Sequence, residues 1–98
     1  MFITGDLRKF IRTPFVKHIK YSVSASDMNE SMHTRDTAVS IDISKGGLGI
    51  ITSCYLDAGR VLTFEDEIKI NSITAKSAIV RWAEKINGNN YRVGLKFV

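Results

Sequence analysis

The chain has 98 residues, enough for one domain with a single modest core. Lysine and arginine number 14 against 10 acidic residues, so the net charge of +4 favours an anionic partner but is mild for a nucleic-acid-binding protein. The single cysteine, Cys54, excludes an internal disulfide. We expect neither a signal peptide nor a membrane span, because no apolar run approaches the required length, and we therefore expect a soluble cytoplasmic protein, a monomer or weak dimer.

The N-terminal segment, residues 1–15, carries two arginines four positions apart, Arg8 and Arg12. Like charges at this spacing repel each other on a helix, and Pro14 biases Thr13 away from the helical conformation. A long helix is therefore excluded here. We expect a flexible arm over residues 1–15, followed by the folded part of the chain over residues 16–98.

Beyond the arm, apolar and polar side chains alternate in short runs, which is the pattern of half-buried β-strands. Polar or glycine-containing turns separate the runs, and the stretch 87–90 (Asn-Gly-Asn-Asn) is a strong hairpin signal. The expected strands are 16–25, 35–44, 48–53, 60–64, 67–70, 73–86 and 91–97. Six or seven short strands without a long helix predict an all-β fold, an antiparallel barrel or sandwich, and closure of the sheet would hide its edges.

The expected strand 35–44 ends in a cluster of short polar side chains. Apolar residues at every second position from Val39 to Ile43 place Ser40, Asp42 and Ser44 together on the opposite face. A register slip of one residue would turn Asp42 inward.

Two glycines, Gly46 and Gly47, follow this cluster directly. Both can adopt the positive φ angles of a tight turn, and both let a ligand approach the backbone closely. The structural interpretation is an Asx or Ser turn, in which Asp42 and Ser44 bond their own backbone. The functional interpretation requires a ligand at this turn.

Arg8-x-x-x-Arg12, followed about thirty residues later by Asp42-x-Ser44-x-x-Gly47, resembles the two-part signature of the PilZ domain family, RxxxR and [D/N]xSxxG. Both halves are complete, and the ending 91–97 resembles the last barrel strand of that family. The resemblance covers nearly the whole chain and implies a single PilZ domain over residues 1–98. It also implies a six-stranded antiparallel β-barrel, here in a minimal form with a flexible N-terminal arm and no long C-terminal helix.

PilZ domains are receptors for cyclic di-GMP, a bacterial second messenger, and the resemblance implies that ligand here. The matching residues are the expected ligand-binding residues: Arg8, Arg12, Asp42, Ser44 and Gly47. An arginine fork can meet the Hoogsteen edge of guanine or clamp a phosphate, and a carboxylate can accept from the Watson–Crick edge. A serine can donate to phosphate or base, whereas a side chain at the glycine would obstruct the approach. Secondary contacts could come from Lys9, Lys45, Gly46 and Trp82.

Two residues bear on how the ligand is held. A tryptophan on a barrel strand is most often part of the core, so we expect Trp82 there; the alternative is that its indole faces the site and stacks on guanine. Leu7 stands where many family members carry a further arginine, and this predicts one ligand per chain.

Nothing in the sequence indicates catalysis. His18 and His33 lie far apart without a cluster of metal-ligand spacing, and no nucleophile is paired with a base. We expect no enzyme, metal or cofactor, but a receptor whose arginine arm becomes ordered around cyclic di-GMP. Such a receptor would signal to a separate, unidentified effector protein, in motility, biofilm formation or virulence.

Two other functions fit parts of the sequence. One is a PilZ-like adaptor that recognises protein without a ligand, although such members lose the arginines that are intact here. The other is a small barrel that binds single-stranded nucleic acid, but the sequence has no obvious row of exposed aromatic residues. An ordinary barrel with a coincidental motif is the remaining alternative.

Overall fold

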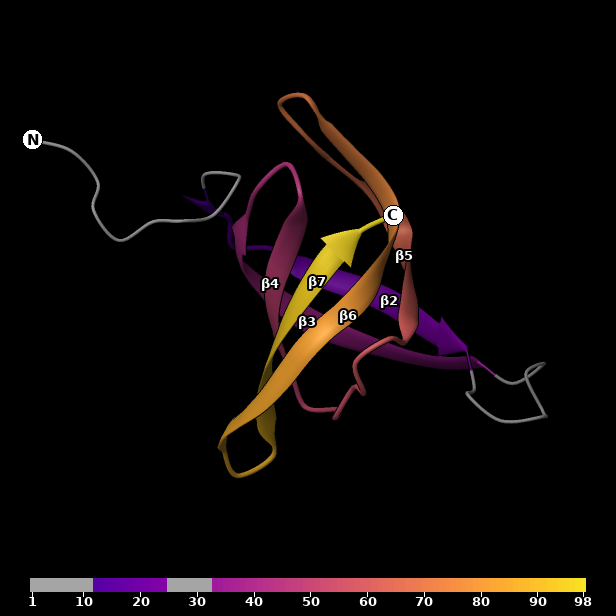
Figure 1. Ribbon diagram of the computed structural model, residues 1–98, viewed down its shortest axis with the longest axis vertical. Helices are drawn as coiled ribbons and strands as arrows, with labels where there is room; N and C mark the ends of the chain where they lie inside the picture. Colours follow the sequence, from indigo (N-terminus) through magenta and orange to yellow (C-terminus); the bar gives the residue numbers. More distant parts are fainter. Residues whose placement is uncertain (1–11, 25–32) are drawn as a thin grey trace, which may run out of the picture.

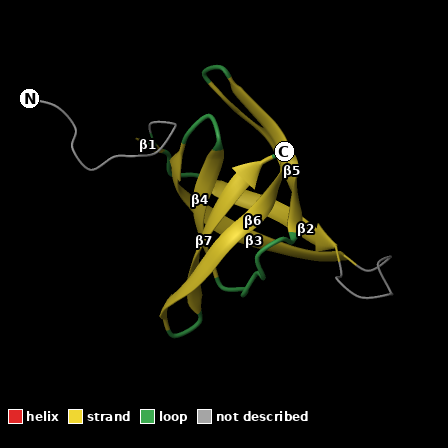
Figure 2. Ribbon diagram, viewed as in Figure 1, coloured by secondary structure: helices red, strands yellow, loops and turns green. Residues whose placement is uncertain are grey.

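The computed structural model describes residues 12–24 and 33–98, and all regular structure in these two ranges is β-strand (Figure 1). The strands are β1 (Thr13–Pro14), β2 (His18–Ser24), β3 (His33–Ile43), β4 (Gly47–Thr52), β5 (Val61–Ile70), β6 (Ile73–Asn87) and β7 (Asn90–Phe97). Neighbouring strands are antiparallel throughout (Figure 2). No helix in these ranges is long and apolar enough to cross a membrane.

Six of the strands form a closed barrel in the order β3-β2-β5-β6-β7-β4, because β3 pairs with both β2 and β4. The short strand β1 pairs with β3 outside this ring, so that Thr13 and Pro14, expected in the arm, are part of the sheet. A proline suits this edge position because it has no N–H to donate to a further strand. The predicted six-stranded antiparallel barrel is confirmed.

The barrel interior is filled by inward-facing side chains from every strand of the ring. Its buried apolar residues include Ile19, Tyr21, Val23, Leu48, Ile50, Leu62, Val80, Val93 and Leu95. The hydroxyl of Tyr21 reaches across the core to Thr52 Oγ1 at 2.9 Å. Burial raises the pKa of Tyr21 to about 12, so the buried phenol keeps its proton at pH values where an exposed tyrosine begins to ionise.

One predicted strand boundary is wrong. Residues 60–64 and 67–70 were expected as two strands, but β5 runs without interruption from Val61 to Ile70. Its pairing with β6 is irregular between Thr63 and Ile68, so the acidic residues between them leave the ladder without ending the strand.

Two β-bulges change which side chains face outward. On β3, Ser40 pairs with Ile50 and Asp42 with Gly49, so Ile41 is an extra residue. An extra residue reverses the inward–outward alternation beyond it. Ser40 is therefore fully buried, whereas Asp42 points outward beside Ile41. The expected common face for Ser40, Asp42 and Ser44 is wrong.

The second bulge lies on β6. Val80 pairs with Leu95 and Trp82 with Gly94, so Arg81 is the extra residue. Regular alternation from the buried Val80 would place Trp82 in the core, but the bulge turns it outward, where it is 44% exposed. The expectation that Trp82 is a core residue is wrong.

Candidate functional site

The two bulges place Asp42 and Trp82 at opposite ends of one row of residues across four strands. Asp42 on β3 pairs with Gly49 on β4, Gly49 pairs with Gly94 on β7, and Gly94 pairs with Trp82 on β6. Three strand spacings separate the ends of the row, about 14 Å. The two central positions carry no side chain, so the outer wall of the barrel has a backbone floor here that neighbouring side chains can cover.

The side chains at the ends of this row lean inward over the glycines. A Cβ at Gly49 would lie 2.7 Å from Asp42 Oδ1, and a Cβ at Gly94 would collide with the indole of Trp82. The indole and the carboxylate thus lie against the floor. We call this surface, formed by Asp42, Gly49, Gly94 and Trp82, the glycine trough.

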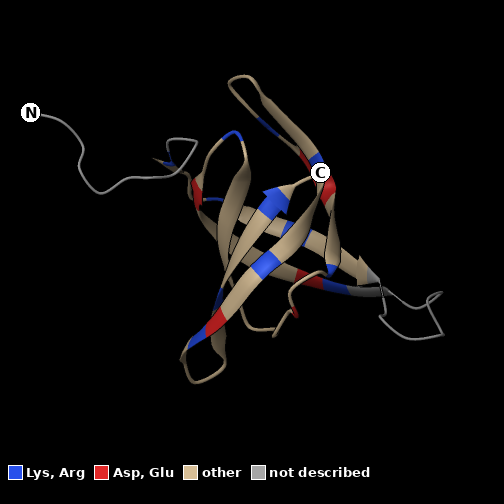
Figure 3. Cartoon of the chain, in the orientation of Figure 1, with Lys and Arg blue, Asp and Glu red and all other residues tan. Residues whose placement is uncertain are grey.

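The glycine trough belongs to a pocket of about 300 Å³. Besides the four trough residues, the pocket is lined by Arg12, Ile41, Arg81, Arg92 and Leu95. Lys and Arg positions occur along the strands of the barrel (Figure 3), and Arg81 on β6 and Arg92 on β7 line the pocket. An aromatic face, one carboxylate and three guanidinium groups around one pocket suit a flat, anionic ligand with hydrogen-bond donors on one edge.

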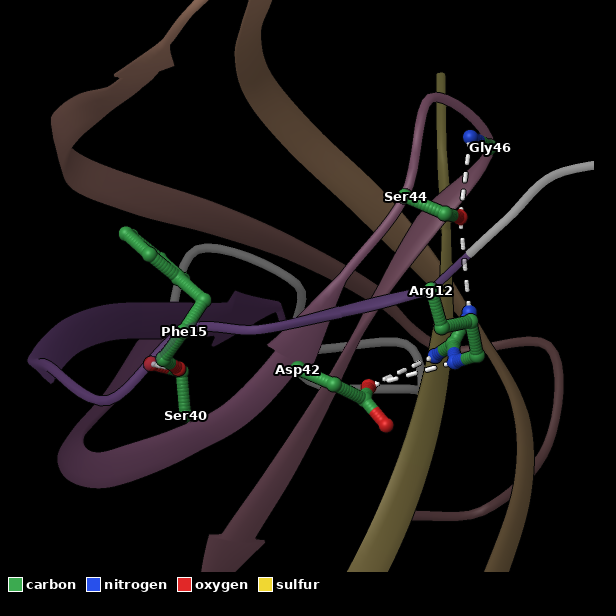
Figure 4. A network of polar contacts seen from close by, with 6 residues as sticks. All are labelled: Arg12, Phe15, Ser40, Asp42, Ser44 and Gly46. Atoms are coloured by element: carbon green, nitrogen blue, oxygen red, sulfur yellow. Dashed lines mark hydrogen bonds and ion pairs between the residues drawn. The ribbon is translucent and has the colours of Figure 1, made fainter.

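Arg12 is positioned by strand pairing. Thr13 pairs with Ile43, so the next residue towards the N-terminus lies alongside Ser44 and reaches Asp42. Its Nη2 lies 3.0 Å and its Nε 3.2 Å from Asp42 Oδ1, and its Nη1 donates to Ser44 Oγ at 3.4 Å (Figure 4). Within the described residues Asp42 Oδ2 accepts no hydrogen bond. The motif's two halves, 30 residues apart, therefore meet in one network.

The turn after β3 is built differently from the sequence expectation. Ser44 and Gly47 close it with reciprocal backbone hydrogen bonds of 2.9 and 3.4 Å, and Ser44 Oγ also accepts from Gly46 N–H at 3.2 Å. Neither glycine has a positive φ angle. Ser44 thus makes the local turn contact that such residues commonly make and contacts Arg12 as well, whereas Asp42 is committed to Arg12 instead of its own turn.

Gly47 has a structural reason to be glycine that sequence reasoning missed. A Cβ at this position would collide with the backbone carbonyl of Leu95 on β7. A backbone atom in a paired strand cannot move aside cheaply, so close packing of β4 on β7 requires the glycine. Any role in ligand approach comes in addition to this requirement.

A buried serine holds the chain that leads from Arg12 into β2. Ser40 Oγ donates to the carbonyl of Phe15 at 2.6 Å and accepts from Lys17 N–H at 2.9 Å (Figure 4). The backbone adds a bond from Ser40 N–H to Lys17 C=O and one from Phe15 N–H to Ile41 C=O. The segment 15–17 between β1 and β2 is thereby tied to the residues around the bulge that orients Asp42.

The remaining predicted residues fall into two groups. Arg8 and Lys9 lie outside the described residues. Lys45 is exposed in the turn after β3, and Trp82 faces the pocket rather than the core. Among residues 12–24 and 33–98, no group of three or more acidic, histidine or cysteine side chains could hold a metal ion.

Sequence reasoning missed six pocket residues: Ile41, Gly49, Arg81, Arg92, Gly94 and Leu95. A glycine inside a strand often marks a bulge or a close approach of another group, so Gly49 and Gly94 carried a usable signal. Arg81 and Arg92 carried no such signal, because the bulges determine which outward-facing residues lie beside them.

A model of the PilZ domain family matches residues 6–98. A search of curated proteins found no match. The match covers almost the whole chain, including both arginines of the arm and the Asp42 turn, and PilZ domains are a family of cyclic di-GMP receptors rather than enzymes. The chain belongs to the PilZ domain family.

Proposed function

We propose that this chain is a cytoplasmic receptor for cyclic di-GMP and binds one ligand in the pocket beside the glycine trough. The observation that carries the proposal is the network at the edge of this pocket, where Arg12 contacts Asp42 and Ser44. Opposite it stands the exposed indole of Trp82. The two motif halves and an aromatic face thus surround one open surface.

The geometry supports guanine as the base. A guanine in the pocket can stack on the indole of Trp82, an interaction that contributes about 1–3 kcal/mol in nucleic-acid complexes. Its Watson–Crick edge carries donors, and the open Oδ2 of Asp42 can accept from them. Adenine does not present donors in that pattern, so the carboxylate would discriminate between the two purines.

Arg12 keeps donors for the ligand despite its protein contacts. A guanidinium has five N–H donors, and the contacts to Asp42 and Ser44 engage at most three of them. The others can meet a phosphate or the O6 and N7 atoms of guanine. Arg8, four residues earlier, would add a second guanidinium from the arm.

Ligand binding would order the arm and so create a new surface. Folding the predicted arm over the nucleotide would cost conformational entropy, which the arginine contacts must offset. A separate effector protein would recognise the ordered arm, and the barrel would transmit the signal without catalysing a reaction.

The experiment is a titration of cyclic di-GMP into the R8A/R12A variant. We expect the double variant to lose binding while its barrel melts as a folded domain, because Arg12 is partly exposed and lies on the outer wall. The charge-matched control is R35A/K76A, which removes two exposed cations that do not line the pocket. Unchanged affinity in R8A/R12A would rule out the proposed site.

A further inference from the structure

Two arginines outside the two-part motif line the same pocket as Arg12. Arg81 is the extra residue of the β6 bulge, directly before Trp82. Arg92 lies on β7 two residues before Gly94, and the two positions are about 6.6 Å apart along the strand. Because side chains alternate along a strand, Arg92 and Gly94 are on the same, outer face. The glycine trough is therefore bordered by cations that the known motif does not include.

These two arginines are not used by the fold. Both side chains are exposed, and neither forms an ion pair with any residue in 12–24 or 33–98. Glu84 stands across from Arg92 in the β6–β7 ladder but makes no ion pair with it. Arg12, by contrast, is already paired with Asp42. Within the described residues, the pocket thus has two positive charges without an ion-pair partner beside the Arg12–Asp42 pair.

A surface arginine is ordinarily a solvated side chain, and two features distinguish this pair. Both side chains line one concave site instead of being scattered over the barrel. In addition, the bulge that exposes Trp82 is the one that inserts Arg81 into the outer wall. The aromatic face and the adjacent guanidinium therefore come from a single local irregularity.

We propose that Arg81 and Arg92 bind the phosphodiester groups of the dinucleotide. This inference rests on the proposed function and assigns different groups of the ligand to different residues of the site. Arg12 and Asp42 take the edge of the base, and the second pair of arginines takes the two phosphate charges. A phosphodiester accepts charge-assisted hydrogen bonds from a guanidinium fork, and each of these two phosphates carries one negative charge.

The arrangement follows from the row structure of the trough. A base stacked on the indole of Trp82, which covers Gly94, has Arg81 next to its aromatic partner and Arg92 at the next outward position of β7. The sugar and phosphate attached to that base must leave the floor towards the pocket rim. Both cations stand on that rim.

The test is calorimetric titration of cyclic di-GMP into the wild-type chain, R81Q/R92Q and R81K/R92K at low and high potassium chloride. The charge-matched control is R35Q/K76Q, which removes two exposed cations outside the pocket. We expect R81Q/R92Q to bind about tenfold or more weakly than wild type, and R35Q/K76Q to bind as wild type does. R81K/R92K should recover part of the loss, because it keeps the charge but not the fork.

Salt dependence separates the phosphate role from a general loss of structure. Screening should weaken wild-type binding at high salt and affect R81Q/R92Q less, since its phosphate contacts are gone. Wild-type affinity and salt dependence in R81Q/R92Q would overturn this inference and leave the proposed function intact. A wild-type chain that does not bind would overturn both.

Discussion

Individual glycines in this barrel are required for different reasons. Gly47 is constrained by the backbone of Leu95, whereas Gly94 is constrained by the side chain of Trp82. The first constraint concerns the stability of the fold, and the second concerns the position of an aromatic face in the candidate site. The same substitution at the two positions therefore separates stability from ligand binding.

We predict that G47A lowers the free energy of unfolding by roughly 1–3 kcal/mol, because its methyl group must displace paired backbone. G94A should be milder in stability but should push the indole of Trp82 off the floor. Loss of stacking would then weaken cyclic di-GMP binding by on the order of tenfold. Trp82 is the only tryptophan, so its fluorescence reports the displacement directly, while urea unfolding reports stability.

An unshifted Trp82 emission in G94A, with wild-type affinity, would contradict this account of the trough. Equal destabilisation by G47A and G94A would also contradict it, because this account expects a clash with backbone to cost more stability than a clash with a side chain.

At the scale of strands, the site depends on two bulges that the sequence pattern could not show. The period-two pattern correctly predicted strands over most of β2, β3, β4, β6 and β7, because half-buried strands alternate. It placed Ser40 and Trp82 on the wrong faces, because one extra residue reverses the alternation and leaves no mark in composition. Asp42 was expected to face outward and does so, but only because of the bulge at Ile41.

Ser40 connects the bulge on β3 to the segment that follows Arg12, through its hydrogen bonds to Phe15 and Lys17. We predict that S40A loosens this connection. The variant would leave the partly buried N–H of Lys17 without its acceptor and release the carbonyl of Phe15, costing roughly 1–3 kcal/mol of stability. Because β1 carries Arg12 to Asp42, ligand affinity should fall as well. Calorimetric titration and urea unfolding measure the two effects separately.

T52V is the matched control for S40A. It removes another buried hydroxyl, the partner of Tyr21, on the strand β4 and away from β1. We expect comparable destabilisation with unchanged affinity. If S40A and T52V weaken binding equally, Ser40 has only a structural role.

At the scale of the molecule, the barrel could be predicted because closure is the simplest way for short antiparallel strands to hide their edges. The proximity of Arg12 and Asp42 could also be predicted, because both halves of the motif can be recognised in the sequence. The glycine trough could not be predicted, since it is a row across β3, β4, β7 and β6 that exists only after the ring closes in this register. The fold thus assembles a pocket from residues spread between Arg12 and Leu95.

The most direct test of the central claim is calorimetric titration of cyclic di-GMP into the wild-type chain, with cyclic di-AMP and GTP as controls and thermal melts alongside. We predict saturable binding of one ligand per chain, absent with the controls. At a free ligand concentration one hundred times Kd, linkage adds about 2.7 kcal/mol to the free energy of unfolding and raises Tm by roughly ten degrees or more. Absence of both heat and a shift in Tm would contradict the receptor account and favour a PilZ adaptor that recognises protein alone.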